Sequence, residues 1–277
     1  MTLKVSVLMS AYNEEEKVAS TIESVLNQSL TDFEYVIVND GSKDLTWEIL
    51  EKYAKSDPRI KLINNEKNIG LTASLNKGIR SCSGQYIARL DAGDICHPKR
   101  LQVQSEFLDK NPDVYIVGCF HRWIDKNGKV LSEYTFPTQS KQILSHVFGF
   151  GAVAAHPCIM LRESLLDSIG VYDLKHISLE YDLYMRTLVA GYSMTNVPEY
   201  LLDVLRRGEG MSISRNKEIF ADMFRIRLKY LPKMFSLRNT AYTAMSFVLI
   251  FVPGNVLRKA ITSPLWSKKL RKVFLKG

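Results

Sequence analysis

The amino-acid sequence predicts an α/β protein built on a mostly parallel, doubly wound sheet. Apolar strand-like segments alternate with amphipathic helical segments over the first 118 residues, at the spacing of β–α units. The strand-like segments are almost continuously apolar, as in Lys4 to Ser10, which is typical of strands buried on both faces. Ligands of such sheets bind beside the carboxyl ends of the strands, so the residues that follow each strand are candidate site residues.

Each element of this half follows from a local pattern. Strands are expected at residues 4–10, 33–39, 60–64, 86–90 and 114–118. The first helix is expected to carry Glu14, Glu15 and Glu16 in its first turn, where acidic side chains suit the helix dipole. A later helix is expected to start at His97-Pro98, because proline suits the first helical position.

Beyond residue 118 the alternation changes. The expected elements are a hairpin over 119–134 around Asn127-Gly128, a short strand over 156–161, a short helix over 163–168 that ends at Gly170, and a helix that opens at Leu179. Glu180 and Asp182 fall in the first turn of that last helix. Taken alone, these acids are explained by the helix dipole, and His156 by a place in the core.

Two carboxylates follow the strand that begins at residue 86. Asp91 and Asp94 stand on a turn whose other residues, Ala92 and Gly93, are small, so the backbone there can approach a ligand closely. Carboxylate oxygens and substrate phosphates are suitable ligands for Mg²⁺ or Mn²⁺. A solvated acidic turn is the alternative, and Asp94 is expected to be exposed on this turn.

Distinctive residues follow three of the expected strands. Tyr12 and Asn13 follow the first, Asp40 the second, and Asp91 with Asp94 the fourth. Each has a plain explanation by itself, such as a turn-forming role for Asp40, but parallel strands bring their carboxyl ends to one edge. Neither a G-x-G-x-x-G after the first strand nor a G-x-x-x-x-G-K-[ST] loop is present, which argues against a dehydrogenase or a P-loop enzyme. A carboxylate-held metal is therefore the expected partner for ligand phosphates.

Composition indicates a globular protein from a reducing compartment. Of the 277 residues, 46% are hydrophobic, enough for a substantial core. The four cysteines are far apart and form no C-x-x-C pair, which argues against a zinc site. Residues 1–12 show no secretory signal, and we expect a cytoplasmic location.

The charge is distributed unevenly. Residues 223–277 contain twelve Lys and Arg and no Asp or Glu, which leaves 25 basic and 29 acidic residues in positions 1–222. A basic block of this kind is typical of contact with an anionic surface, either lipid or nucleic acid. No recognised nucleic-acid motif is present, and we expect lipid rather than nucleic acid.

An apolar run from Thr240 to Val252 lies inside this basic block. It is closed by Pro253-Gly254 and is shorter than the ~20 residues that span a bilayer. We therefore expect the run to lie on or in a membrane, with the basic residues around it near anionic headgroups. The alternative is a helix packed on the rest of the protein, with its charges merely solvated.

An ordered set of segments resembles the family 2 glycosyltransferases of the GT-A fold, over roughly residues 3–215. The matching segments are VSVLMSAYNEEE, VIVNDGS, NIGLTASLNKGI, GQYIARLDAGD, HPKRL, HPCIMLR, IGVYD and EYDLYMR. The resemblance implies a GT-A catalytic domain over 1–215, with a nucleotide-sugar-binding half (1–118) and an acceptor-side half (119–215). A helical, basic, amphipathic region over 216–277 follows.

The resemblance also implies roles for individual residues. Tyr12 and Asp40 fall where the family holds the nucleotide base, and Asp91 and Asp94 fall in its Asp-x-Asp-Asp region, which meets ribose, metal and diphosphate. Glu180 falls at the position of the catalytic base. The remaining residues assigned to the nucleotide-sugar site are Ala11, Asn13, Asn68 and Ala92.

This chain departs from the family pattern at three places. Gly93 replaces an Asp of the metal motif, and Leu179-Glu180 stands where a Glu-Asp pair is usual. Arg206-Arg207-Gly208 replaces an Arg followed by His, which excludes a histidine ligand there but leaves either Arg able to meet phosphate.

The expected function is that of an inverting, metal-dependent glycosyltransferase. It would move a sugar from a nucleotide-diphosphate sugar, with UDP as the expected nucleotide, to a glycan or lipid-linked acceptor in bacterial cell-surface polysaccharide or lipid-linked oligosaccharide synthesis. Two alternatives stay open from the sequence: a GT-A-fold binding or scaffold protein, and a nucleic-acid-binding protein that uses the basic tail.

Overall fold

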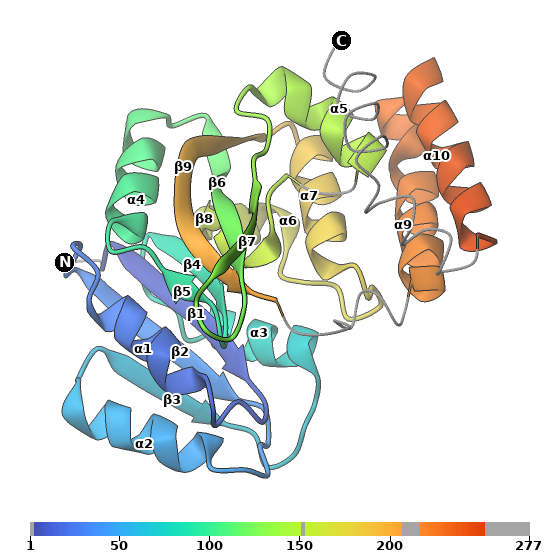
Figure 1. The fold of residues 1–277 in the computed structure, drawn as a ribbon. Helices are drawn as coiled ribbons and strands as arrows, with labels where there is room; N and C mark the ends of the chain where they lie inside the picture. The colour runs from blue at the N-terminus through green and yellow to red at the C-terminus, as the bar shows by residue number, and fades with distance from the viewer. Residues whose placement is uncertain (1–2, 151–152, 207–215, 253–277) are drawn as a thin grey trace.

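The computed structural model describes residues 3–150, 153–206 and 216–252, which Figure 1 shows as a ribbon. Its strands are β1 (Val5–Ala11), β2 (Phe33–Asn39), β3 (Ile60–Asn64), β4 (Tyr86–Asp91), β5 (Ile95–Cys96), β6 (Val114–Ile124), β7 (Val130–Tyr134), β8 (Met160–Arg162) and β9 (Ser193–Leu205). Within the described residues they form one nine-stranded sheet in the order β3-β2-β1-β4-β8-β6-β9-β5, with β7 paired to β6.

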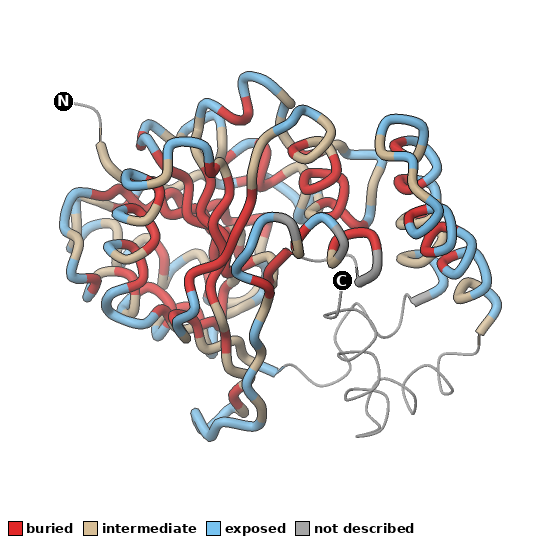
Figure 2. Tube along the Cα trace, turned by 90° about the horizontal axis from the view of Figure 1, so that it is seen from above, coloured by how far each residue is buried: buried red, intermediate tan, exposed pale blue. Residues whose placement is uncertain are grey.

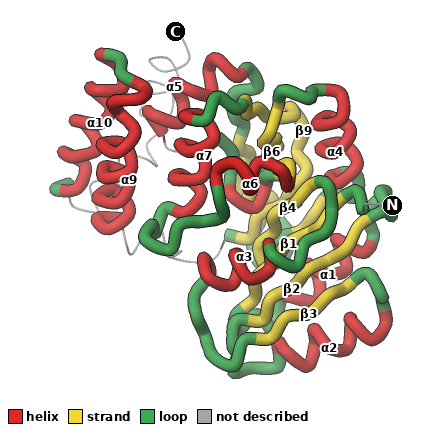
Figure 3. Tube along the Cα trace, turned by 180° about the vertical axis from the view of Figure 1, so that it is seen from behind, coloured by secondary structure: helices red, strands yellow, loops and turns green. Residues whose placement is uncertain are grey.

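Helices precede or follow these strands along the chain. They are α1 (Val18–Leu26), α2 (Thr46–Ser56), α3 (Leu71–Ile79), α4 (Arg100–Lys110), α5 (Ser140–Phe150), α6 (Glu163–Ile169), α7 (Leu179–Val189), α9 (Asn216–Tyr230) and α10 (Leu237–Ile250), with short 3₁₀ helices η1 (His156–Cys158) and η2 (Leu231–Met234). Figure 1 shows α1 in front of the sheet, and Figure 3, from behind, shows α3 and α6 on the opposite face. The sheet is therefore doubly wound, as predicted.

The first part of the sheet is parallel. β1 pairs in parallel with β2 on one side and β4 on the other, and β2 pairs in parallel with β3. All seven residues of β2 are buried, because helices cover both faces of these strands. Since β1, β2 and β4 are parallel neighbours, their carboxyl ends meet at one edge.

The second part of the sheet is mixed. β8 is antiparallel to both β4 and β6, whereas β6 and β9 are parallel to each other. The hairpin expected at residues 119–134 is present, as β6 and β7 pair antiparallel with His121 opposite Tyr134. β6 extends to Ile124, beyond the predicted end at Gly118, because it forms one arm of this hairpin and also pairs along its length with β9.

Three local predictions differ from the structure. α1 begins at Val18, so Glu14–Glu16 precede the helix, and the Glu14 carbonyl instead accepts the backbone N–H of Lys17 and of Val18, both at 2.9 Å. α4 begins at Arg100, two residues after Pro98. Residues 156–158 form η1, and the short strand starts only at Met160.

The C-terminal helices pack on the rest of the protein. α9 contacts α7, and α10 contacts α9 and α5. Arg227 donates to the Tyr181 hydroxyl (2.9 Å), and Tyr230 donates to the buried Asp182 carboxylate (3.2 Å), so α9 is joined to α7 by polar bonds. Figure 2 shows that buried residues concentrate in the sheet and on the inner sides of the helices. No helix of the described chain is long and apolar enough to cross a bilayer.

Candidate active site

The carboxyl edge of the parallel strands gathers the residues that the sequence singled out. Ala11 lies opposite Asn39 in the β1–β2 pairing, and Ser10 lies opposite Asp91 in the β1–β4 pairing. Tyr12, Asp40 and Asp91 therefore leave the sheet at the same edge. The predicted convergence of these strand ends is confirmed.

Asp40 holds the loop that leads from β3 to α3. Its side chain is 2% exposed, and its Oδ1 accepts from Asn65 Nδ2 (3.0 Å) and from the Ile69 N–H (2.8 Å). Its Oδ2 accepts from the Gly70 N–H (3.0 Å). By accepting these three hydrogen bonds, the Asp40 carboxylate holds the backbone of the β3–α3 loop in place.

The backbone next to Asp40 approaches Asn68 closely. Gly41 has φ +69, and a Cβ there would lie 2.4 Å from the Lys67 carbonyl carbon and 2.5 Å from the Asn68 nitrogen. Only glycine fits this contact. Asn68, which the resemblance assigns to the nucleotide-sugar site, is exposed and lies beside the turn that carries Asp40.

A loss of the Asp40 carboxylate is expected to loosen this loop. Asp40→Ala leaves three donors without their acceptor, and each buried unsatisfied donor costs about 1–3 kcal/mol. We expect a lower thermal midpoint and weaker nucleotide binding, measured by differential scanning fluorimetry and calorimetry. Asp32→Ala, at an exposed position, is the control. A normal midpoint in Asp40→Ala would contradict this structural role.

The β1–α1 loop carries Tyr12 and Asn13. Tyr12 is 44% exposed, as a base-stacking ring requires. Asn13 adopts φ 54, and its Oδ1 accepts the Lys43 N–H at 2.8 Å. The loop is therefore tied to the segment after β2.

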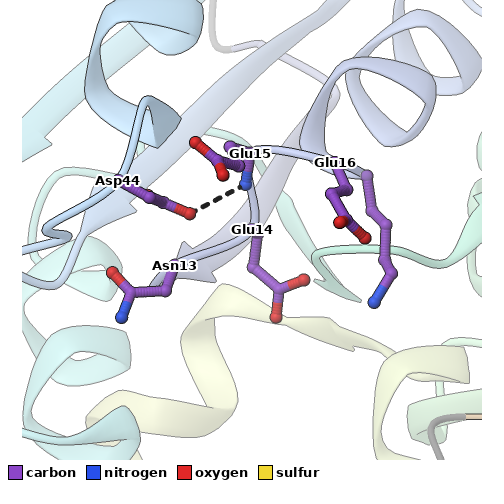
Figure 4. A pocket seen from close by; sticks show the side chains of 6 residues that line it. Asn13, Glu14, Glu15, Glu16 and Asp44 are labelled. Atoms are coloured by element: carbon purple, nitrogen blue, oxygen red, sulfur yellow. Dashed lines mark hydrogen bonds between the residues drawn. The ribbon is translucent and has the colours of Figure 1, made fainter.

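Asp44 gives this loop a second anchor, and Figure 4 shows it beside Asn13 and the three glutamates. Its Oδ2 accepts the Glu15 N–H at 3.2 Å, while its Oδ1 accepts from Thr46 at the start of α2. Burial acts to raise the pKa of the Asp44 carboxyl, but the hydrogen bonds from Thr46 and Glu15 outweigh it and lower the pKa. A cavity of ≈ 170 Å³ lies here, and its three glutamates make it a poor place for a diphosphate.

Asp91 is the accessible carboxylate of the pair after β4. Its side chain is 41% exposed and forms an ion pair with Nη1 of Arg89, whose side chain is 2% exposed. The Arg89 carbonyl oxygen accepts from Nη2 of Arg100 at 2.8 Å, and Arg100 is fully buried at the start of α4. The HPKRL segment thus supports the strand end that carries Asp91.

Asp94 is buried, and the expectation that it would be exposed is wrong. Its exposed fraction is 2%, and its Oδ1 accepts the Leu205 N–H at 3.0 Å. The cause is β9, whose carboxyl end covers the turn: Ile95 of β5 pairs with Asp203. Asp94 therefore joins the metal-motif turn to the end of β9.

The turn fits a hard divalent cation. It offers two carboxylates three residues apart. Gly93, which lies between them, has φ 96, a backbone conformation that glycine adopts without strain. In the part of the chain that the structure describes, no group of three or more His, Cys, Asp or Glu side chains is placed so that it could hold a metal ion. Mg²⁺ commonly uses only one or two carboxylates and takes its other oxygens from phosphate and water, so a turn with two carboxylates is compatible with such a cation.

Glu180 lies at the start of α7, within electrostatic reach of this turn. It is half-buried, and burial raises the pKa of its carboxyl above the usual value. The charge of Arg89 lowers this pKa, while those of Asp91 and Asp222 raise it. Glu180 therefore lies within range of the charge of Asp91, although the two residues are 89 positions apart in the sequence.

His156 has a hydrogen-bond partner inside the protein, as expected of a core histidine, and this partner, Tyr172, was not foreseen from the sequence. His156 Nε2 lies 2.8 Å from the Tyr172 hydroxyl, and burial together with the charge of Arg89 holds the pKa of this His156 ring well below its usual range. Burial raises the pKa of Tyr172, which also feels the charges of Arg89, Glu180 and Asp91. The sequence did contain a sign that Arg89 is important. It is a charged residue inside an otherwise apolar strand, and a buried charge needs a partner.

Arg206 lies at the far side of the same edge. Its guanidinium stands over the Trp123 ring, 5.4 Å from the centroid, and its N–H donates to the Ile124 carbonyl at 2.9 Å. Arg207, the second Arg expected to meet phosphate, lies outside the described residues, as does the tail from residue 253 onward.

Comparisons with known proteins identify the family and the fold. The model of the family described as Glycosyl transferase family 2 matches residues 6–170. The amylovoran biosynthesis glycosyltransferase AmsE of Erwinia amylovora is 30% identical over 261 residues, which cover 91% of this chain and 96% of AmsE.

Two solved structures share the fold. TarS 1–349 of S. aureus in complex with UDP-GlcNAc has a TM-score of 0.71 at 19% identity, covering 99% of this chain and 81% of that one. The mannosyltransferase PcManGT of Pyrobaculum calidifontis, in complex with GDP-Man and Mn²⁺, has a TM-score of 0.68 at 15% identity, covering 99% and 85%. With the family match over more than half of its length, this chain belongs to glycosyltransferase family 2 and has a GT-A-like fold.

Proposed function

We propose that this protein is an inverting, metal-dependent glycosyltransferase. The observation that carries the proposal is that Glu180, at the start of α7, lies within range of the charges of the Arg89–Asp91 ion pair at the carboxyl end of β4. A general base beside a diphosphate-binding motif is the arrangement that a single displacement at a sugar carbon needs.

Glu180 is the proposed catalytic base. An acceptor hydroxyl attacks the anomeric carbon, the bond from that carbon to the diphosphate breaks, and Glu180 takes the hydroxyl proton. A raised pKa suits this role, because a carboxylate with greater basicity accepts a proton more readily. One attack from the face opposite the leaving group inverts the configuration.

Asp91 and Asp94 are the proposed metal ligands. A divalent cation held there would stabilise the charge that develops on the departing nucleoside diphosphate. Arg89 holds Asp91 in place through their ion pair, and Leu205 holds Asp94 through its N–H. These contacts orient both carboxylates before a ligand binds.

The proposed donor is a UDP-sugar. TarS was solved with UDP-GlcNAc and with UDP, and its fold matches this chain over nearly the whole length. PcManGT was solved with GDP-Man, so a GDP-sugar is the alternative donor. The residues proposed to hold the nucleotide and sugar are Ala11, Tyr12, Asn13, Asp40, Asn68, Asp91 and Ala92.

The proposed acceptor is a growing glycan or a lipid-linked oligosaccharide, as the name of AmsE supports. We also propose an anionic membrane as a partner of residues 223–277, because this stretch has twelve basic residues and no acid. The enzyme would then act from the cytoplasmic face of the cell membrane.

A screen of nucleotide-sugars by thermal shift, with and without Mn²⁺, tests the donor and the metal together. A donor that binds the folded state raises the thermal midpoint, and we expect UDP-sugars to do so only with Mn²⁺. Release of UDP from the stabilising donor, followed by NMR of the sugar product, reports turnover and inversion. Donor binding without any turnover on any acceptor or water would favour a scaffold protein instead.

A further inference from the structure

Helix α10 packs its polar side against the protein and exposes its apolar side. Its buried residues are Asn239, Tyr242, Thr243 and Ser246, which recur at helical spacing and face α9. Its exposed residues on the opposite side include Leu237 (85% exposed), Val248 (60%) and Phe251 (68%), the last at the C-cap. A helix of a water-soluble surface shows the opposite arrangement.

Three of the four buried polar side chains of α10 bond to nearby backbone carbonyls, in α10 itself or in the preceding η2. Thr243 donates to the Asn239 carbonyl (2.8 Å), Ser246 donates to the Thr243 carbonyl (2.7 Å), and Asn239 donates to the Met234 carbonyl (2.7 Å). These bonds let small polar residues face α9 without loss of hydrogen bonds. The polar side of α10 therefore packs against α9, and the apolar side of α10 is exposed at the protein surface.

The apolar side is continuous along the helix. Leu237, Ala241, Ala244, Val248 and Phe251 follow one another at intervals of three or four residues and are all exposed. Met245 and Phe247, also exposed, flank this row. A contiguous apolar surface of this kind marks a contact with another molecule or a membrane.

Charge distinguishes the occupants that could cover this row. The stretch from 223 to 277 has twelve basic residues, which lie on either side of an uncharged run over 239–257, and no acidic residue. The same stretch of a second copy would therefore bring like charges together, and residues 253–277 have the same sign as Arg238 on the helix they would cover. Lys233 and Arg238, both exposed, stand just before the row and on the first turn of α10. An anionic bilayer complements both the apolar row and these cations.

We propose that α10 lies in the plane of an anionic bilayer with this apolar row in the acyl-chain region. A helix of 14 residues is about 21 Å long, shorter than the ~30 Å hydrocarbon core, so it lies along the interface and does not cross it. The inference rests on the proposed membrane partner and names the residues that enter the membrane.

The test uses the full chain with two aspartates on the row, Leu237→Asp with Val248→Asp. Flotation with vesicles of phosphatidylglycerol and phosphatidylcholine at low salt measures the partition coefficient. We expect about a 100-fold fall relative to the unmodified chain, because two exposed apolar side chains no longer enter the bilayer. The matched control is Val130→Asp with Leu131→Asp, on the exposed part of β7, and its partition is expected to be unchanged.

Other results would overturn the proposal in distinct ways. An unchanged partition in the α10 variant means that another surface contacts lipid. A lower thermal midpoint of that variant without lipid means that the protein's own chain covers the row, and conversion of a dimer to a monomer in light scattering means that a second copy does. Glu180→Gln is expected to float like the unmodified chain, so a failure of the proposed catalysis leaves this result intact.

Discussion

Replacement of Glu180 by glutamine is expected to reduce kcat by about 10²–10⁴-fold with little change in donor affinity. Glutamine keeps the shape of the side chain but cannot accept the acceptor proton. Steady-state kinetics with saturating donor, and donor binding by calorimetry, separate the two effects. Glu163→Gln is the matched control, since Glu163 is also half-buried in the first turn of a helix, α6. A loss confined to donor binding would place Glu180 in the donor site.

The raised pKa of Glu180 adds two checks by pH. Activity of the unmodified enzyme should fall as pH drops through this raised pKa, because the base becomes protonated. The free energy of unfolding changes with pH in the opposite direction. The folded state binds the Glu180 proton more tightly than the unfolded state, so the protein loses stability as pH rises and this carboxyl becomes charged. Glu180→Gln should therefore have a higher thermal midpoint than the unmodified chain at pH 7, and the gap should close below about pH 4.

Replacement of Asp91 by asparagine is expected to reduce Mn²⁺-dependent turnover by about 10³-fold. A bound metal ion stabilises the negative charge that develops on the leaving diphosphate in the transition state by several kcal/mol. Little stability should be lost, because the Asp91 side chain is 41% exposed. Turnover and donor-induced thermal shift across a Mn²⁺ titration measure both effects. Asp109→Asn is a close control: Asp109 is 40% exposed and paired with Lys4 at 2.7 Å, away from the site.

Asp94→Asn should behave differently from Asp91→Asn. Asp94 is buried and accepts the Leu205 N–H, so its replacement is expected to lower the thermal midpoint as well as turnover. Near-normal activity in Asp94→Asn would show that Asp94 is not a metal ligand. Near-normal activity in Asp91→Asn, with normal Mn²⁺ dependence, would remove Asp91 from the site.

The parallel half of the fold could be predicted because its signals are local. Strand segments such as Phe33 to Asn39 and Ile60 to Asn64 appear with the predicted bounds. All seven residues of the first are buried, and such apolar runs are typical of inner parallel strands, whereas only Ile60 is buried in the second, which lies at the edge of the sheet. The gathering of Tyr12, Asp40 and Asp91 at one edge followed from parallel topology alone.

The start of a helix was less predictable where side chains from elsewhere compete. Glu14 and Glu15 suit a first helical turn by composition, yet their backbone N–H groups donate to Thr46 and Asp44. Those acceptors come from the next β–α unit. A window of sequence around Glu14 does not contain them, so helix propensity alone placed the start of α1 too early.

Residue identity and short-range order were enough to predict the family, the α/β class and the chemical type of the candidate site residues. Which groups are buried and paired could be seen only in the folded chain. Asp94 is covered by Leu205, 111 positions away. The charges of Arg89 and Asp91 on β4 act on Glu180, which lies on helix α7, and the polar side of α10 faces inward because α9 lies there. Burial and pairing depend on contacts between distant segments, and those contacts exist only once the chain has folded.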